Sequence, residues 1–331
     1  MISFFKEKSK IILVCLFVLL TCTACSNPKG SDGKTKVTSI IAAEDFKIEK
    51  SKVNTTDIDD EDLKKEYAKL KDDDLIEIKA TSYGSAWKNG WFEGLIVWPL
   101  AQLINKISAM TDAGWGIIIT TILIQTLVFL ITRKSQMGSQ KMQEIQPELQ
   151  KIQDKYSGRD DDQSRMKMYN ETQALYKKYD IHPFGSIAVM FLQLPIMMGM
   201  YYATMRSAAV LTGNFMGIKF DGTPASGFAT GNVPYMVIYI SMVILSFLSM
   251  LAPQVMNWWE RKHSHEKRKD YKSSGGNTQN SMVMTMLFST GMISFLYLSW
   301  PIAMSFYWLV SSLINLIKSI VIHKMMKKEE K

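Results

Sequence analysis

The sequence predicts an all-α membrane protein with five transmembrane helices, a cytoplasmic helical hairpin and an N-terminal amphipathic helix at the membrane interface. Hydrophobic residues make up 47% of the 331 residues, and aromatic residues make up 11%. They gather in apolar runs of about 20 residues, a length that crosses a hydrocarbon core at about 1.5 Å per helical residue. Between the first two runs, apolar residues recur in a polar segment at spacings of three and four, which indicates a helical hairpin.

Residues 1–24 have the parts of an export signal. A basic start precedes the apolar core over 11–20, and small residues stand just before Cys25. A cysteine at this point resembles the lipobox of bacterial lipoproteins, although Cys22 takes the place of the leucine usual in that pattern. We therefore expect Cys25 to carry lipid, palmitate included, and to anchor the mature N-terminus. Ordinary cleavage, or an uncleaved anchor, is the alternative.

Residues 25–82 are polar, charged and poor in aromatic side chains, which predicts a flexible extracellular tether. Acidic clusters at 59–62 and 72–74 suit weak cation binding, but they lack the glycine and terminal glutamate of a calcium loop. Over 86–110, tryptophans and aliphatic residues form an amphipathic pattern that Pro99 interrupts. Such helices favour the membrane interface, so we place this one on the outer surface.

The first span, 116–132, leads into a polar arm, 133–182, and then into the second span, 184–205. Pro147 is expected to kink or restart the first helix of the arm. The arm carries two apolar seams, separated by a break near Gly158, that predict a hairpin of paired helices. The first seam comprises Met142, Ile145, Leu149, Ile152 and Tyr156, and the second comprises Met168, Thr172, Leu175 and Tyr179.

The remaining predicted segments are the spans 235–256, 282–299 and 302–322, the loop 257–280 and the basic tail 323–331. Lys and Arg number ten in the arm, six in the loop 257–280 and four after residue 322, but only two in 206–234. Basic segments beside spans stay in the cytoplasm. The arm, the loop and the C-terminus are therefore predicted to be cytoplasmic, with the N-terminus outside the bacterial plasma membrane.

Polar residues recur on stripes of these spans. Polar groups within a bilayer usually face protein or water rather than lipid. Hydrogen bonding between helices is the alternative for all of these polar residues, and we favour it for the serines and Thr285. For Gln125, Gln193 and Asn315 we instead expect a wetted groove. The full set of candidate groove residues is Thr121, Gln125, Thr132, Gln193, Thr204, Thr285, Ser289, Ser305, Trp308, Ser312 and Asn315.

Ordered motifs over residues 85–326 resemble the YidC family of membrane protein insertases, in its Gram-positive lipoprotein form. The motifs are Trp98-Pro99-Leu100, Met142 to Leu149, Pro183-Phe184-Gly185-Ser186, Leu192 to Ile196 with Tyr201-Tyr202, and Pro301 to Trp308. The resemblance implies five helices around a hydrophilic groove that opens to the cytoplasm and the lipid and is closed outside. It also implies nascent membrane proteins as substrates, with the ribosome and the Sec translocon as partners.

The first span departs from the family pattern at one position. The family usually carries an arginine in the groove there, which the resemblance implies would attract acidic substrate ends. Aligning the hairpin motifs puts Gln125 at that position, and Arg133 lies eight residues later, at the cytoplasmic interface. Glutamine keeps hydrogen-bond donors and an acceptor but no charge. An uncharged groove wall is therefore expected at this position.

Other functions fit the sequence less well. A transporter or channel is the main alternative, but the chain lacks inverted repeats and matched broken helices. The predicted spans contain no Asp, Glu, His or Cys to act as base or nucleophile, so no enzyme is expected. The net charge is +8, and the basic residues that give it lie beside the spans rather than on one face of a soluble domain, which argues against specific nucleic-acid binding. The three cysteines precede residue 26, and His263 and His265 lack a third ligand, so no metal site or cofactor is expected.

Overall fold

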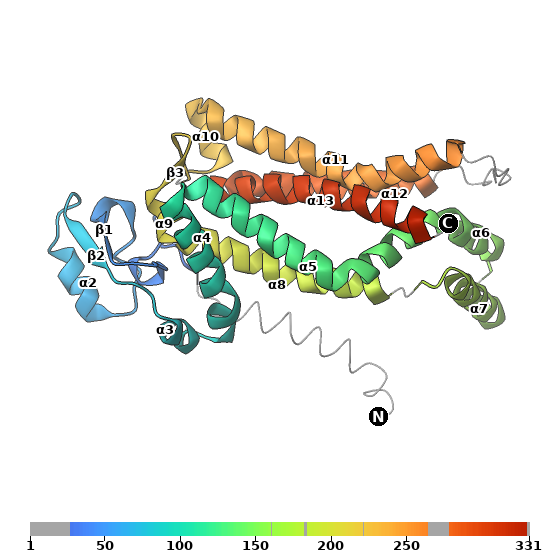
Figure 1. Ribbon diagram of the computed structural model, residues 1–331, viewed down its shortest axis with the longest axis horizontal. Coiled ribbons are helices and arrows are strands. Elements are labelled where there is room, and N and C mark those ends of the chain that lie inside the picture. The colour runs from blue at the N-terminus through green and yellow to red at the C-terminus, as the bar shows by residue number, and fades with distance from the viewer. Residues whose placement is uncertain (1–26, 160, 182–183, 221, 264–277, 330–331) are drawn as a thin grey trace, which may run out of the picture. The chain divides into compact units, whose positions relative to one another are not determined.

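A computed structural model of the chain describes residues 27–159, 161–181, 184–220, 222–263 and 278–329, apart from some side chains near helix ends (Figure 1). The predicted signal 1–24, Cys25 and most of the loop 257–280 lie outside the described residues. The chain is mostly helical and divides into two compact units. The first unit is Met1–Leu123, Phe191–Tyr239 and Ser299–Tyr307, and the second is Ile124–Met190, Ile240–Leu298 and Trp308–Lys331.

The apolar runs form long helices (Figure 1). These are α5 (Ala113–Glu144), α8 (Phe184–Arg206), α11 (Val233–His263), α12 (Thr278–Leu296), which the 3-10 turn η4 (Tyr297–Ser299) extends, and α13 (Ile302–Glu329). Among the described residues, three segments are long and apolar enough to cross a membrane: Ala113–Glu144, Val233–Asn257 and Ile302–Lys327. A mostly helical membrane protein is thus confirmed, and the arrangement of five spans remains a prediction.

The long helices expose apolar side chains, as helices in lipid do. On α5, Leu127, Leu130 and Ile131 are exposed, whereas Gln125 is buried. On α11, Ile240, Ile244 and Leu248 repeat this exposed pattern at helical spacing. Each of these helices therefore has an apolar face that no described residue covers.

In the first unit, the segment predicted to be a flexible tether is folded from residue 27 to residue 82, so that prediction is wrong. β1 (Phe46–Glu49) pairs antiparallel with β2 (Leu75–Ile78), with Ile48 opposite Ile76. The 3-10 turns η1 (Val37–Ser39) and η2 (Lys50–Lys52) and the helix α2 (Glu61–Ala68) complete this N-terminal subdomain. Its core comprises Val37, Ile40, Ala42, Ile48, Val53, Ile58, Ile76 and Ile78.

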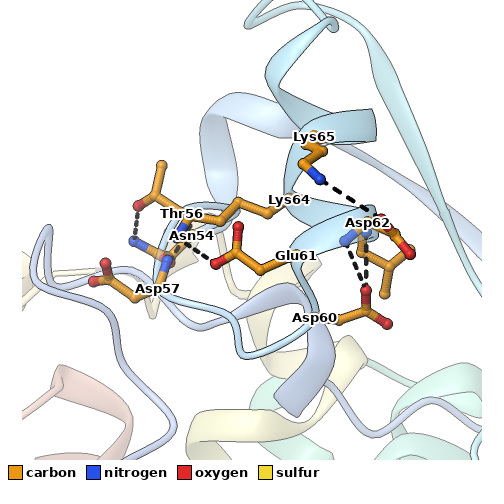
Figure 2. A network of polar contacts seen from close by, with 9 residues as sticks. Asn54, Thr56, Asp57, Asp60, Glu61, Asp62, Lys64 and Lys65 are labelled. Atoms are coloured by element: carbon orange, nitrogen blue, oxygen red, sulfur yellow. Dashed lines mark hydrogen bonds and ion pairs between the residues drawn. The ribbon is translucent and has the colours of Figure 1, made fainter.

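Both acidic clusters of the N-terminal subdomain serve its turns. The Asp60 carboxylate accepts the N–H groups of Asp62 and Leu63 at 3.0 and 3.1 Å and caps the start of α2 (Figure 2). In the other cluster, Asp74 Oδ2 accepts the N–H of Lys71 at 2.7 Å. No group of three or more acidic, histidine or cysteine side chains in the described ranges is placed to hold a metal ion. Backbone hydrogen bonding therefore accounts for Asp60 and Asp74 better than the cation binding that the sequence allowed.

Residues 35–42 tie the N-terminal subdomain to helices of the same unit. Ile41 donates its N–H to the carbonyl of Arg206 at 2.7 Å and accepts the N–H of Ala208 at 3.0 Å. Asn105 Nδ2 donates to the carbonyl of Ile41 at 2.8 Å. These bonds satisfy buried polar groups on both sides of the segment, which holds it between the end of α8 and a helix that begins at Trp98.

The predicted interfacial segment, 86–110, contains the end of α3 (Tyr83–Lys88), the π-helical turn η3 (Glu93–Val97) and α4 (Trp98–Met110). Pro99 does not interrupt the helix. The π turn before it bonds the N–H of Trp98 to the carbonyl of Glu93, so the helix reaches Pro99 without needing its missing N–H. Ile104 and Asn105 on α4 are buried in protein. Part of the face expected to meet the membrane is therefore covered.

The rest of the first unit packs around aromatic rings. After α8 come α9 (Ala208–Thr212), the hairpin of β3 (Asn214–Phe215) and β4 (Ile218–Lys219), and α10 (Pro224–Thr230). Phe215 and Phe220 approach Phe306 with ring centroids 5.1 and 5.6 Å apart. Gly114 lies against the Phe215 ring, where a side chain would collide. These contacts join the first turns of α5 and α13.

In the second unit, the polar arm forms α6 (Gln146–Tyr156) and α7 (Asp162–Lys178). The helix α5 continues past residue 132 to Glu144, and Pro147 stands in the first turn of α6, where it restarts the helix as predicted. Ile145, Leu149, Leu175 and Ile181 form a buried cluster, against which Met142, Ile152, Tyr176 and Tyr179 pack. The predicted pairing of the two seams is confirmed at this end of the hairpin.

Toward the tip of the hairpin, polar bonds replace the predicted apolar seam. Met168 and Thr172 do not join the buried cluster. Instead, Glu171 accepts hydrogen bonds from Lys155 Nζ at 2.6 Å and from Tyr156 Oη at 2.8 Å. The Lys155 ammonium and then the Tyr156 hydroxyl hold the pKa of Glu171 below its ordinary value.

Candidate functional site

Gln125, near the middle of α5, is buried and bonded at both ends of its amide. Its side chain is 2% exposed, and Nε2 donates to Ser311 Oγ on α13 at 3.1 Å. Its Oε1 accepts a hydrogen bond from Lys318 Nζ, also on α13, at 2.5 Å. A polar bridge of Gln125, Ser311 and Lys318 therefore joins two helices within segments apolar enough to span a membrane.

Lys318 corrects the expectation of an uncharged groove wall at Gln125. Ser311 and Lys318 are seven residues apart, which is two helical turns, so they share one face of α13. The predicted stripe through Ser312 and Asn315 lies next to this face. The sequence could have pointed to Lys318, because a basic side chain nine residues before the end of the apolar segment Ile302–Lys327 is unusual.

The predicted groove residues of α13 have separate surroundings. Ser312 is buried, and its hydroxyl lies 2.9 Å from that of Ser246 on α11, which favours the alternative of bonding between helices. Ser305 is buried as well, and its hydroxyl has no hydrogen-bond partner among the described residues. Asn315 is exposed, and the Trp308 ring packs on the tyrosine of η4 with centroids 5.2 Å apart.

The predicted threonines of α5 and α8 bond to their own helices. The hydroxyls of Thr121, Thr132 and Thr204 donate to the carbonyl four residues before them at 2.7, 2.6 and 2.9 Å. This local bond occupies the single hydroxyl donor of each residue. All three threonines are also buried, and Thr132 Oγ1 accepts a further hydrogen bond from Gln136 Nε2 at 2.6 Å, so none of them offers a free donor to a passing chain.

The other predicted residues lie on α8 and α12. Gln193 and Ser289 are half-buried, and the side chain of Thr285 lies outside the described part of the structure. Next to Ser289, the Thr290 hydroxyl donates to Met250 Sδ on α11 at 3.0 Å. Small polar residues of α12 thus also bond between helices.

The structure therefore places the predicted residues in different settings. Thr121, Gln193, Thr204 and Ser305 belong to the first unit, and the others belong to the second. Gln125 is the predicted residue that meets a charged partner, and both of its partners were missed by the stripe pattern. Further along the same two helices, Met137 of α5 packs against Ile322 and Met326 of α13. Apolar packing thus continues the contact that the polar bridge makes.

Comparison with known families decides the identity of the chain. Residues 104–330, more than two thirds of the sequence, match the model of the 60Kd inner membrane protein family. The chain belongs to this family. The matched region includes α5, the hairpin and α13, and so contains the whole polar bridge.

Relatives within the family carry insertase names. The chain is 27% identical to Membrane protein insertase MisCA of Bacillus subtilis, over 70% of this chain and 79% of that protein. It is 26% identical to Membrane protein insertase YidC 2 of Listeria innocua, over 72% of this chain and 74% of that protein. A relative from Streptococcus pyogenes, Membrane protein insertase YidC 1, is 37% identical over 40% of this chain, a match that spans about half (46%) of that protein. The resemblance to YidC membrane protein insertases is confirmed.

Proposed function

We propose that the chain receives nascent membrane proteins in a hydrophilic groove open to the cytoplasm and the lipid, and releases their helices into the bilayer without covalent chemistry. The observation that supports this most is the polar bridge of Gln125, Ser311 and Lys318. Polar and charged groups inside apolar helices oppose membrane insertion, so they mark functional positions. Polar groups within the membrane-spanning helices shorten the stretch of hydrocarbon that a polar segment of the substrate has to cross.

We propose that the N-terminus lies outside the cell and that lipid on Cys25 anchors it. The arm and the C-terminus then lie in the cytoplasm, as the ten basic residues of 133–182 against two in 206–234 support. In this topology the N-terminal subdomain is extracellular. Mass spectrometry of the intact mature protein is expected to show diacylglyceryl-Cys25 as the first residue. A mature chain that starts elsewhere, or an unmodified cysteine, contradicts the anchor.

The ribosome and the Sec translocon are the proposed partners besides the nascent chain and the bilayer. The helix α7 supports a docking role, because Met166 and Tyr169 are exposed apolar side chains on an otherwise charged helix. Photocrosslinkers at these two positions are expected to capture ribosomal proteins or nascent chains. Capture of proteins from the outer side of the membrane would contradict both the partner and the topology.

The deciding experiment reconstitutes the purified protein in vesicles with a single-span reporter protein. Protection of the reporter tail from added protease measures insertion, and an ion-sensitive dye in the same vesicles measures flux. Insertion that depends on the protein, without ion flux, is the expected result. Flux without insertion would favour a transporter or channel instead.

A further inference from the structure

We propose that the tip of the β3–β4 hairpin inserts into the lipid beside the start of α5 and anchors that part of the first unit in one leaflet of the bilayer. The proposal rests on the topology proposed above, in which this leaflet is the outer one. It concerns an outer apolar patch, defined as Met110, Trp115 and Met216. The partner of this patch is lipid rather than a second protein.

Met216 stands at the tip of the hairpin in a backbone conformation that suits other residues better. Met216 and Gly217 join the two strands, and both have a positive φ, of 50° and 83°. Such turns favour Asn-Gly, because a larger side chain at positive φ crowds its own backbone. The turn therefore gives no local reason for a methionine, whose side chain is 82% exposed. Residues that break a local rule in this way often serve a contact outside the fold.

The patch continues onto the face of α5 that no described residue covers. Trp115 is 47% exposed, and its ring meets that of Phe215, the residue before Met216, with centroids 6.3 Å apart. Ile122, two turns later on α5, is exposed on the same face as Trp115. Met110 is exposed at the end of α4, shortly before α5 begins. Lipid that covers this face of α5 therefore also borders the hairpin tip.

The depth and the low charge of this region fit the membrane interface. The segment that is apolar enough to cross a membrane begins at Ala113, so Trp115 lies in its first turn. Tryptophan is enriched at this level of a bilayer. Residues 207–234 contain only two charged side chains, Lys219 and Asp221. Lys219 is exposed on β4, where its ammonium can reach lipid phosphates while the tip enters the acyl chains.

The hairpin is packed firmly enough to act as an anchor. Phe215 contacts Phe306, near the start of α13, with ring centroids 5.1 Å apart. Gly114, in the first turn of α5, lies against the same Phe215 ring, and the missing side chain permits this approach. One ring therefore connects the hairpin tip to two long helices. Insertion of Met216 into lipid fixes the depth at which both helices begin.

The first test measures how fast cysteines at two exposed positions react with a charged maleimide when the purified protein is embedded in lipid nanodiscs. Met216→Cys is expected to react about tenfold more slowly than Leu75→Cys, the factor that corresponds to burying one apolar side chain in lipid. Exposure within the protein predicts the opposite order, because Met216 is 82% exposed and Leu75 is 58% exposed. Leu75 is the matched control, since it is an exposed aliphatic residue of the same unit that follows three aspartates. The parent gives the background from its own three cysteines.

Brominated lipids identify what covers the tip. A fluorophore on Met216→Cys is expected to be quenched by lipids whose acyl chains carry bromine, whereas the same fluorophore on Leu75→Cys should not be quenched. Quenching at both positions, or at neither, would overturn the proposal.

Met216→Asn separates contact with lipid from the needs of the turn. Asparagine tolerates positive φ better than methionine, so the variant should be at least as stable as the parent in detergent. A fluorophore on Lys219→Cys should nevertheless lose its quenching by brominated lipids when Met216→Asn is added. A lowered unfolding temperature would show that the methionine serves the fold, which contradicts the proposal.

Reaction of Met216→Cys in nanodiscs as fast as that of Leu75→Cys would also overturn the proposal. So would protection of Met216→Cys that appears in whole cells but not in nanodiscs, because the patch would then belong to a protein partner. Nanodiscs expose both faces of the membrane, so these results do not depend on the orientation of the chain. Leu75→Cys that resists the charged reagent in intact cells would instead contradict the proposed topology, and with it the assignment to the outer leaflet.

Discussion

The guanidinium of Arg206, at the end of α8, binds the carboxylate of Glu93, in η3, through two contacts of 2.7 and 2.8 Å. Both side chains are buried. Arg206 Nε donates in addition to the carbonyl of Ser39 at 2.6 Å. One side chain therefore joins α8, the predicted interfacial helix and the N-terminal subdomain within the first unit.

Arg206→Met is expected to destabilise the protein by about 3–5 kcal/mol, because it leaves the Glu93 carboxylate buried without a partner. Thermal unfolding of the detergent-solubilised protein measures the loss. Arg206→Met combined with Glu93→Leu should recover much of it, since the double variant buries no unpaired charge. A single variant as stable as the parent would show that water reaches Glu93.

Ile76→Asp is expected to unfold the N-terminal subdomain, because it buries a carboxylate in an apolar core at a cost of about 3 kcal/mol or more. Its neighbour provides a matched control: Ile76 is 3% exposed and Leu75 is 58% exposed on the same strand. Limited proteolysis with trypsin should cut residues 27–82 rapidly in Ile76→Asp, and slowly in the parent and in Leu75→Asp. Rapid cutting in all three proteins would support the flexible tether that the sequence predicted.

The effect of substituting Gln125 on the stability of the protein should depend on the charge of Lys318. Gln125→Glu is expected to form an ion pair with Lys318, so the protein should stay as stable as the parent. Gln125→Arg sets two cations side by side and should destabilise the protein by about 2 kcal/mol or more. Thermal unfolding of the detergent-solubilised protein measures both effects. A Gln125→Arg protein with parental stability would mean that Lys318 leaves the bridge.

The tip of the hairpin should loosen in acid. The pKa of Glu171 is lowered from 4.5 by Lys155 and Tyr156, so its stabilising contribution is complete above that value and is lost as the pH falls through the lowered pKa. Spin labels on the exposed positions Gln153 and Ala174 should report a broader distance distribution at about pH 3 than at neutral pH. Glu171→Gln should remove this change, and an unchanged distribution in the parent would contradict the role of Glu171.

The parts of the fold that follow a regular spacing are predictable from the sequence. The seam from Ile145 to Tyr179 and the restart at Pro147 both follow from helical periodicity. The N-terminal subdomain is not predictable in this way, because its aliphatic residues occur in short runs without a regular period and its two strands have four residues each. The aliphatic residues come together in one core only when β1 and β2 pair.

The candidate site was predictable in part. Gln125 is a visible departure in an apolar span, and the structure shows it buried and bonded. Lys318 escapes a pattern of small polar residues because a single lysine barely changes the mean hydropathy of a long apolar segment. Its partner on α5 is 193 residues away in sequence, and such a pairing is decided by helix packing rather than by local spacing.

Because α5 continues without a break beyond the predicted first span, a tilt of that span displaces the base of the hairpin. Twelve residues of unbroken helix, about 18 Å, separate the end of the predicted span at 132 from Glu144, where α6 follows after a single residue. Transmembrane helices are tilted from the bilayer normal by about 20° on average, and a span that is longer than the hydrocarbon core can tilt further to fit it. A tilt of about 20° displaces the end of this 12-residue extension sideways by about 6 Å. In the topology proposed above, a change in membrane thickness would therefore move the base of the hairpin, and the lipid composition of the cell would influence where the hairpin meets its partners.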